Sequence, residues 1–246
     1  MTEPALTLVM IPTYQERENI ELILNRLHAA YPEAHALVVD DGSPDGTADV
    51  AEARARVDPR IHVLRRTEKK GLGAAYIAAM RWGMERGYGV LVEMDADGSH
   101  PPETLPAMVA ALDGPGRPGL VIGSRWVAGG SVVDWPKSRE ALSRAGNGYA
   151  RLALGIDVHD ATAGFRVYRS DLLARIPLHD IVSHGYCFQV DMTLRVLDAG
   201  AAIVEVPIEF REREYGESKM SRSIVVEAML KVTQWGFERR ILRRRR

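Results

Sequence analysis

The chain has 246 residues, is 46% hydrophobic and 26% charged, and carries a net charge of −1, the balance of a globular protein with a sizeable core. Its one cysteine, Cys187, excludes an internal disulfide and suits a reducing compartment. No run approaches about 18 consecutive apolar residues, so no membrane-spanning helix is expected, and the first residues lack the pattern of a signal peptide.

Short apolar runs alternate with segments of helical periodicity along the first half of the chain. Strands are expected at 6–11, 36–39, 61–64, 89–94 and 120–123, and the helical segments include 20–27, 74–85 and 101–112. This alternation predicts an α/β fold with a doubly wound, mostly parallel sheet and helices on both faces.

The second half is less regular. Gly129-Gly130 and Trp135-Pro136 indicate a long loop, after which helices are expected at 140–154 and 187–197 and strands at 165–168 and 202–206. The absence of repeats, low-complexity linkers and a clear boundary favours one domain with an elaborated second half.

Two carboxylates, Asp95 and Asp97, come directly after the apolar run 90–94. Ligands bind at the carboxyl ends of strands in open α/β sheets, and oxygen donors suit Mg²⁺ or Mn²⁺. A lone pair of this kind is more often a solvated turn. The motifs elsewhere in the chain shift the balance toward a site for a metal and a diphosphate.

Two other strand ends carry candidate binding groups. Pro12 is expected to end the first strand, so that Tyr14 and Glu16 reach the crevice, where the ring can stack on a base and the carboxylate can accept hydrogen bonds. Asp41 after the second strand can hold ribose hydroxyls or a base N–H. An acidic helix start and an ordinary turn remain the alternatives. The segment Gly71-Leu72-Gly73 is weak evidence for an anion site.

Basic residues gather at loop-like positions of the second half, where arginine can bind phosphate through two hydrogen bonds and lysine as a point charge. Surface charge explains most of the 32 basic residues. For Arg166, pairing with an acid such as Asp160 is as good an interpretation as catalysis. The candidates for phosphate binding are Arg125, Arg139, Arg166, Arg213 and Lys219.

The chain resembles, over nearly its whole length, the polyprenyl-phosphate (dolichyl-phosphate) mannosyltransferases, which are family 2 glycosyltransferases of GT-A fold. The resemblance rests on PTYQERENI, VVDDGSPDGT, KKGLGAAY, MDADGSHPP, GSRWVAGG, WPKSREALSRAGN, TAGFRVY, GYCFQVDM and REREYGESKMS. The first four motifs are shared with many sugar transferases, and the combination with the last five is specific. Gly98 and Ala163 depart from the family's usual larger apolar residue and serine.

The resemblance implies a role for each matching residue. It implies a nucleotide-sugar site made by Pro12, Tyr14, Glu16, Asp41, Asp95, Ala96, Asp97, Arg213 and Lys219. It implies that Asp95, Asp97 and Ser99 hold the metal and that Arg125 and Arg139 bind the acceptor phosphate. Asp97, Arg125, Arg139 and Arg213 would be the catalytic set.

The resemblance also implies a single GT-A domain over 1–220, with a Rossmann-like nucleotide-binding half at 1–123 and an acceptor half at 124–220. The implied reaction is metal-dependent, inverting transfer of mannose from GDP-mannose to polyprenyl phosphate, with Mg²⁺ or Mn²⁺ as cofactor. A glucosyltransferase that uses UDP-glucose and a catalytically silent nucleotide-binding subunit of a membrane complex are the alternatives. No nucleic-acid partner is expected.

The C-terminal segment 221–246 combines apolar residues at helical spacing with six arginines among the last eight residues. Such a helix and polybasic tail can bind an anionic membrane, which would place the protein at the cytoplasmic face as a peripheral protein, with or without a separate membrane subunit. A helix packed on its own core with a solvated tail is the equal alternative.

Overall fold

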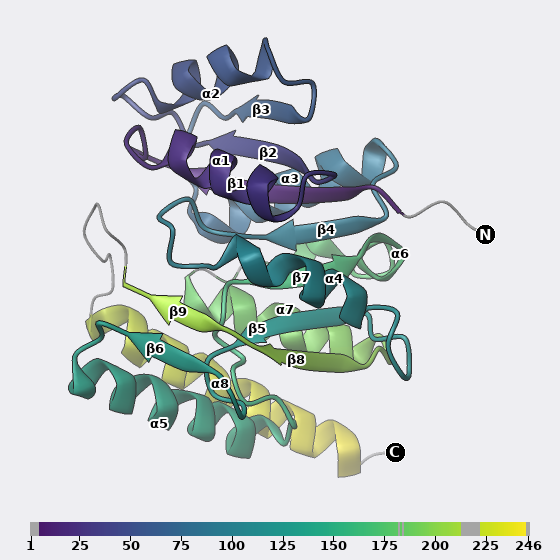
Figure 1. Ribbon diagram of the computed structural model, residues 1–246. Coiled ribbons are helices and arrows are strands. Elements are labelled where there is room, and N and C mark those ends of the chain that lie inside the picture. Colours follow the sequence, from purple (N-terminus) through teal and green to yellow (C-terminus); the bar gives the residue numbers. More distant parts are fainter. Residues whose placement is uncertain (1–4, 182, 184, 213–221, 245–246) are drawn as a thin grey trace.

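The computed structural model describes residues 5–181, 183, 185–212 and 222–244, and within them seven strands form one sheet in the order β3-β2-β1-β4-β7-β5-β8 (Figure 1). Six strands are mutually parallel, and β7 runs antiparallel between β4 and β5. The strands are β1 Thr7–Thr13, β2 His35–Asp40, β3 Ile61–Arg65, β4 Val90–Glu93, β5 Leu120–Ser124, β7 Arg166–Arg169 and β8 Ile203–Pro207.

Helices cover both faces of the sheet, as the alternating pattern predicts. The helices are α1 Ile20–Ala30, α2 Thr47–Ala55, α3 Leu72–Glu85, α4 Leu105–Ala111, α5 Lys137–Leu154, α6 Ser170–Leu173, α7 Tyr186–Asp198 and α8 Arg222–Arg244, with 3₁₀ turns at Pro102–Thr104 and Leu178–Asp180. Residues of α1, α2 and α4 share one buried cluster, and residues of α3, α5, α7 and α8 share the other.

The sheet separates these two cores because successive strand side chains point to opposite faces. Along β1, Leu8 and Met10 belong to the cluster with α3, whereas Val9 and Ile11 belong to the cluster with α1. All four side chains are fully buried, and each such burial stabilises the fold by roughly 1.5–3 kcal/mol.

Strand β1 continues through Pro12, so the expectation that the proline ends it is wrong. The Met10 carbonyl accepts from the Met94 N–H on the β4 side, and the Thr13 carbonyl accepts from the Asp41 N–H on the β2 side. Even-numbered residues of β1 therefore face β4. The missing N–H of Pro12 falls on that side, beyond the last paired residue, Met10, and pairing with β2 is unaffected.

A second small sheet has one of its two strands within the segment that the sequence pattern assigns to a loop. It pairs β6 (Ser131–Val133) in parallel with β9 (Glu209–Arg211). Three-residue strands whose partner lies far along the chain carry little periodic signal, which explains why neither was predicted. The pairing brings the segment after β6 beside the end of β9.

Helices α5 and α8 cross at close range beside the β5–β8 side of the sheet (Figure 1). A Cβ on Gly236 would overlap the Ala153 carbonyl oxygen, so only glycine allows this approach. The hydroxyls of Tyr149 and Thr233 lie 2.5 Å apart across the same contact. Val232 is buried in the core, so α8 packs on the domain, as the second interpretation of the C-terminal segment proposes.

Candidate active site

The loops after β1 and β2 are hydrogen-bonded to each other and form one wall at the carboxyl edge of the sheet. The Gln15 N–H donates to the Ser43 hydroxyl at 3.0 Å, and the Glu16 N–H donates to the Thr47 hydroxyl at 3.0 Å. The Asn19 amide donates to the Glu16 carboxylate at 2.7 Å. The structure thus holds Glu16 in place beside the loop that carries Asp41.

Two cations from the segment after β3 face this wall. Arg66 forms a 2.6 Å ion pair with Asp41, and the ammonium of Lys69 lies 3.5 Å from the centroid of the Tyr14 ring. Burial raises the pKa of the Asp41 carboxyl, and the neighbouring Arg66 offsets part of that rise. The sequence analysis missed Arg66, although a basic residue directly after a strand was a signal for it.

In the segment Gly71-Leu72-Gly73, Gly73 allows helix α3 to pack closely against α7. Leu72 begins α3, and a Cβ on Gly73 would lie 2.7 Å from the Phe188 ring of α7. The second glycine is therefore required where α3 meets α7.

Asp95 and Asp97 follow β4, and each carboxylate is held by a different partner. The Tyr76 hydroxyl of α3 donates to Asp95 at 3.2 Å. The Ser99 hydroxyl and N–H donate to the same Asp97 oxygen at 2.6 and 3.1 Å. Ala96 is buried between them. Ser99 thus orients Asp97, and its role as a direct metal ligand stays a prediction.

The two carboxylates fit a hard divalent cation but do not form a complete cage. Within the described residues, no group of three or more His, Cys, Asp or Glu side chains is arranged to hold a metal ion. The Asp95 side chain is 34% exposed at the open edge of the sheet. Oxygen donors of this kind suit Mg²⁺ or Mn²⁺, which commonly complete their shells with water and substrate phosphates.

A buried acid lies directly beneath this turn. Glu93 ends β4, has no exposed surface, and accepts a hydrogen bond from the Gln189 amide at 2.7 Å. Burial raises the pKa of Glu93 to about 7, although the nearby Arg166 and the Gln189 hydrogen bond oppose the rise. The sequence analysis did not single out Glu93, and the signal was a glutamate in an otherwise apolar strand.

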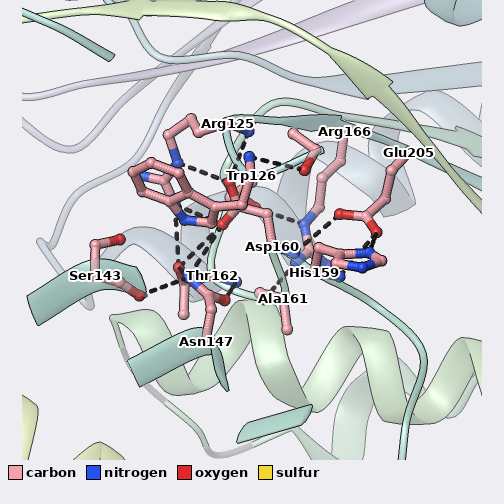
Figure 2. Close-up of polar contacts among 12 residues, drawn as sticks. Arg125, Trp126, Ser143, Asn147, His159, Asp160, Ala161, Thr162, Arg166 and Glu205 are labelled. Atoms are coloured by element: carbon pink, nitrogen blue, oxygen red, sulfur yellow. Dashed lines mark hydrogen bonds and ion pairs between the residues drawn. The ribbon is translucent and has the colours of Figure 1, made fainter. Parts of the chain in front are cut away.

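Arg125 is buried in an ion pair with Asp160, as Figure 2 shows. Its guanidinium donates to the two carboxylate oxygens at 2.7 and 2.6 Å and to the Thr162 hydroxyl at 3.1 Å. Asn147 of α5 donates to Asp160 and Thr162 as well. The cluster ties the loop after β5 to α5 and to the loop before β7.

The suggested pairing of Arg166 with Asp160 is wrong, because Arg125 takes that place. Arg166 has no exposed surface and donates to the carbonyls of Ala161 and Ala163, both at 2.7 Å, and to the Thr193 hydroxyl at 3.1 Å. These are structural contacts, so Arg166 is a core residue at the start of β7.

Arg139 lies at the start of α5 and faces the end of β9. Its guanidinium carbon is 4.0 Å from the centroid of the Trp135 ring, and it forms an ion pair with Glu212. Arg125 is 5.5 Å from the same tryptophan ring. The structure therefore places beside one tryptophan ring the two arginines to which the family resemblance gives the acceptor phosphate.

An apolar cavity of about 390 Å³ opens beside these two arginines. Its wall is made by α5, α7 and α8, and it includes the one cysteine of the chain, Cys187. The lining residues besides Arg125 and Arg139 are Trp135, Leu142, Ser143, Ala145, Gly146, Tyr149, Ala150, Thr162, Cys187, Val190, Ala228, Met229 and Val232. Such a site suits a ligand with an apolar body and an anionic head.

Large apolar side chains are exposed on the two helices that border the cavity: Leu142 and Leu152 of α5, and Met229, Leu230 and Phe237 of α8. In the part of the chain that the structure describes, no helix is long and apolar enough to cross a membrane.

Two of the residues that are expected to bind phosphate, Arg213 and Lys219, lie outside the described residues.

A family model described as glycosyl transferase family 2 matches residues 8–176. The polyprenol monophosphomannose synthase of Mycolicibacterium smegmatis is 55% identical over 240 residues, which are 97% of this chain and 90% of that protein. The undecaprenyl-phosphate mannosyltransferase of Micrococcus luteus is 58% identical over 233 residues, which are 95% of each chain.

Solved structures agree in fold at low sequence identity. The glucosyl-3-phosphoglycerate synthase of Mycobacterium tuberculosis in complex with phosphoglyceric acid has a TM-score of 0.68 and 19% identity, over 94% of this chain and 80% of that one. A mannosyltransferase from Pyrobaculum calidifontis in complex with GDP-mannose and Mn²⁺ has a TM-score of 0.61 and 21% identity, over 98% and 65%. These likenesses confirm the expected GT-A fold.

Proposed function

This chain belongs to glycosyl transferase family 2 and is a glycosyltransferase, and from that membership we propose that it transfers mannose from GDP-mannose to a polyprenyl phosphate. The names of two relatives above 50% identity support the mannosyl group and the lipid phosphate acceptor. Asp95 and Asp97 are candidates to bind the donor diphosphate with its metal ion. Arg125 and Arg139 are candidates to bind the acceptor phosphate, and the apolar cavity is the candidate site for the lipid chain.

The observation that carries the proposal is the apolar cavity with Arg125 and Arg139 in its wall. An isoprenoid chain needs an apolar surface, and its phosphate needs cations that can donate several hydrogen bonds. Trp135 packs against both guanidinium groups and so fixes their position beside the cavity. A small soluble acceptor would leave most of this apolar wall without a contact.

On the donor side, Tyr14, Glu16 and Asp41 form the nucleoside wall, and Asp95 and Asp97 would hold a divalent cation. That cation, when bound, neutralises charge on the diphosphate leaving group. The acceptor phosphate is anionic at neutral pH and needs no strong general base. Its oxygen attacks the anomeric carbon as the bond to the GDP oxygen breaks, so one displacement inverts the configuration. Arg125 and Arg139 orient the acceptor, and Arg213 and Lys219 add positive charge for the phosphates.

A matrix of donors and acceptors tests this proposal. We expect transfer from GDP-mannose to a short polyprenyl phosphate with Mg²⁺ or Mn²⁺, no turnover with glycerol phosphate, and loss of activity in excess chelator. NMR of the product should show inversion at the anomeric carbon. Faster transfer from UDP-glucose would favour the glucosyl alternative, and no turnover with any donor would favour a silent subunit.

We further propose that the exposed apolar residues of α5 and α8 contact the cytoplasmic face of the membrane that holds the acceptor. Replacing Leu152 and Leu230 together by glutamate should weaken sedimentation with anionic lipid vesicles by at least about tenfold, because two apolar contacts are lost and two repulsive charges are added. The matched control is Leu22→Glu on α1. Leu22 is exposed, and α1 packs against the opposite face of the sheet. Equal loss in the control would refute this face as the contact, and failure of the wild-type chain to bind vesicles would indicate a separate membrane subunit.

A further inference from the structure

His100 lies directly behind the acidic turn and is 2% exposed. Its Nδ1 accepts the backbone N–H of Asp95 at 3.0 Å. A ring nitrogen that accepts from a backbone N–H carries no proton, so the proton of the neutral ring lies on Nε2. That nitrogen is 3.9 Å from the Asp95 carboxylate. One imidazole therefore holds the Asp95 peptide and faces the carboxylate of the same residue.

The imidazole is in contact with two aromatic rings. His100 stacks on Phe165, with centroids 5.3 Å apart and an interplanar angle of 10°. It meets Phe210 of β9 edge to face at 5.6 Å and 72°. A Cβ on Gly164 would lie 3.3 Å from the imidazole, so the backbone before Phe165 also closes on the ring. The orientation of His100 is thereby fixed by packing.

The ring contacts continue from His100 to the two acceptor arginines. Phe210 meets Trp135 edge to face at 5.4 Å, and the Trp135 ring lies 4.0 Å from the Arg139 guanidinium. Arg125 is 5.5 Å from the Phe210 ring. The pairing of β6 with β9 holds Phe210 beside the segment that leads to Trp135. An unbroken series of contacts thus joins Asp95 to the acceptor end.

We infer that His100 is a positioning residue with two separable roles in the transfer reaction, an inference that rests on the proposed function. Its Nδ1 keeps the Asp95 peptide in the conformation that presents the carboxylate to the divalent cation of the donor site. Its ring, through Phe210 and Trp135, sets the place of Arg139 at the acceptor phosphate. Packed interiors resist small displacements, so one side chain can fix the spacing between both sites.

Two variants separate these roles. His100→Phe keeps an aromatic ring but removes the acceptor of the Asp95 N–H, and we expect about a tenfold higher KM for Mn²⁺ and donor, with acceptor KM within about twofold. His100→Asn keeps an acceptor near the Nδ1 position but removes the ring, and we expect donor and metal KM near the wild-type values and a several-fold higher acceptor KM. Phe210→Leu should behave like His100→Asn.

Equal changes of the donor and acceptor KM in both histidine variants would overturn the inference, as would a loss of thermal stability with unchanged KM values. Calorimetry of Mn²⁺-dependent GDP binding reads the donor side without turnover and so keeps this test apart from the proposed function. A wild-type chain that transfers no mannose would refute the function, whereas normal GDP binding by His100→Phe would refute the role of Nδ1. If a His100 variant fails to fold, Phe210→Leu still reads the acceptor side, and an unchanged acceptor KM there would overturn that role.

Discussion

Asp97→Asn will lower kcat/KM for mannose transfer by at least about a thousandfold and leave the fold intact. Asp97 is 8% exposed, and its carboxylate accepts two hydrogen bonds from Ser99 at one oxygen. An asparagine oxygen can accept both bonds, so the turn survives. What is lost is an anionic ligand for the divalent cation that would neutralise the diphosphate. Such metal stabilisation amounts to several kcal/mol, and each factor of ten in rate corresponds to about 1.4 kcal/mol.

The measurement is steady-state transfer over a range of Mn²⁺ concentrations, with the melting temperature of the variant alongside. Asp113→Asn is the matched control, because that carboxylate is 82% exposed and pairs only with Arg169 among the contacts described. We expect wild-type transfer from the control. A wild-type kcat/KM in Asp97→Asn would show that Asp97 is not part of the metal site.

Arg125→Met will cost roughly 3–5 kcal/mol of unfolding free energy and abolish transfer. The large effect on stability follows because Asp160, which has no exposed surface, would keep its charge without its cation. Denaturant unfolding measures the loss directly. The variant alone does not separate a structural role of Arg125 from binding of the acceptor phosphate.

The double variant Arg125→Met, Asp160→Asn separates the two roles. Removing both charges leaves no uncompensated ion, so most of the lost unfolding free energy should return. Transfer should stay at least about ten- to a hundredfold below the wild-type rate, because one charge-assisted phosphate contact contributes roughly 1.5–3 kcal/mol. Recovery of both stability and transfer would show that Arg125 is structural and that the acceptor phosphate binds elsewhere.

The strands of the main sheet and helix α1 could be predicted because each has a strong local sequence pattern. The runs that give β1, β2 and β4 are apolar and flanked by turn residues, and α1 repeats Ile20, Ile23, Leu24 and Leu27 on one face. The carboxyl-edge rule then placed Asp41, Asp95 and Asp97 at one edge. Tertiary partners fall outside such rules, so the start of α5, the extension of β1 through Pro12 and the β6–β9 pair were missed.

The contacts among the candidate site residues could not be predicted from the sequence. The sequence suggested Arg166 as a partner of Asp160. The fold shows instead that Arg125, in the loop after β5, donates to both Asp160 oxygens. Glu93, His100 and Phe210 were passed over because each resembles a core position in its own segment. Their importance comes from neighbours that lie far along the chain.

Strand β7 has a consequence for how the protein is made on the ribosome. Strand β7 lies between β4 and β5 and pairs with both, and Arg166 lies opposite Glu93 in the register. Because 73 residues separate these two, about 4 to 15 seconds of synthesis pass before the partner of Glu93 emerges. Until then β4 is a bare sheet edge, and a charged side chain on such an edge discourages association with other chains. A residue that is costly to bury in the finished sheet thus protects the growing chain.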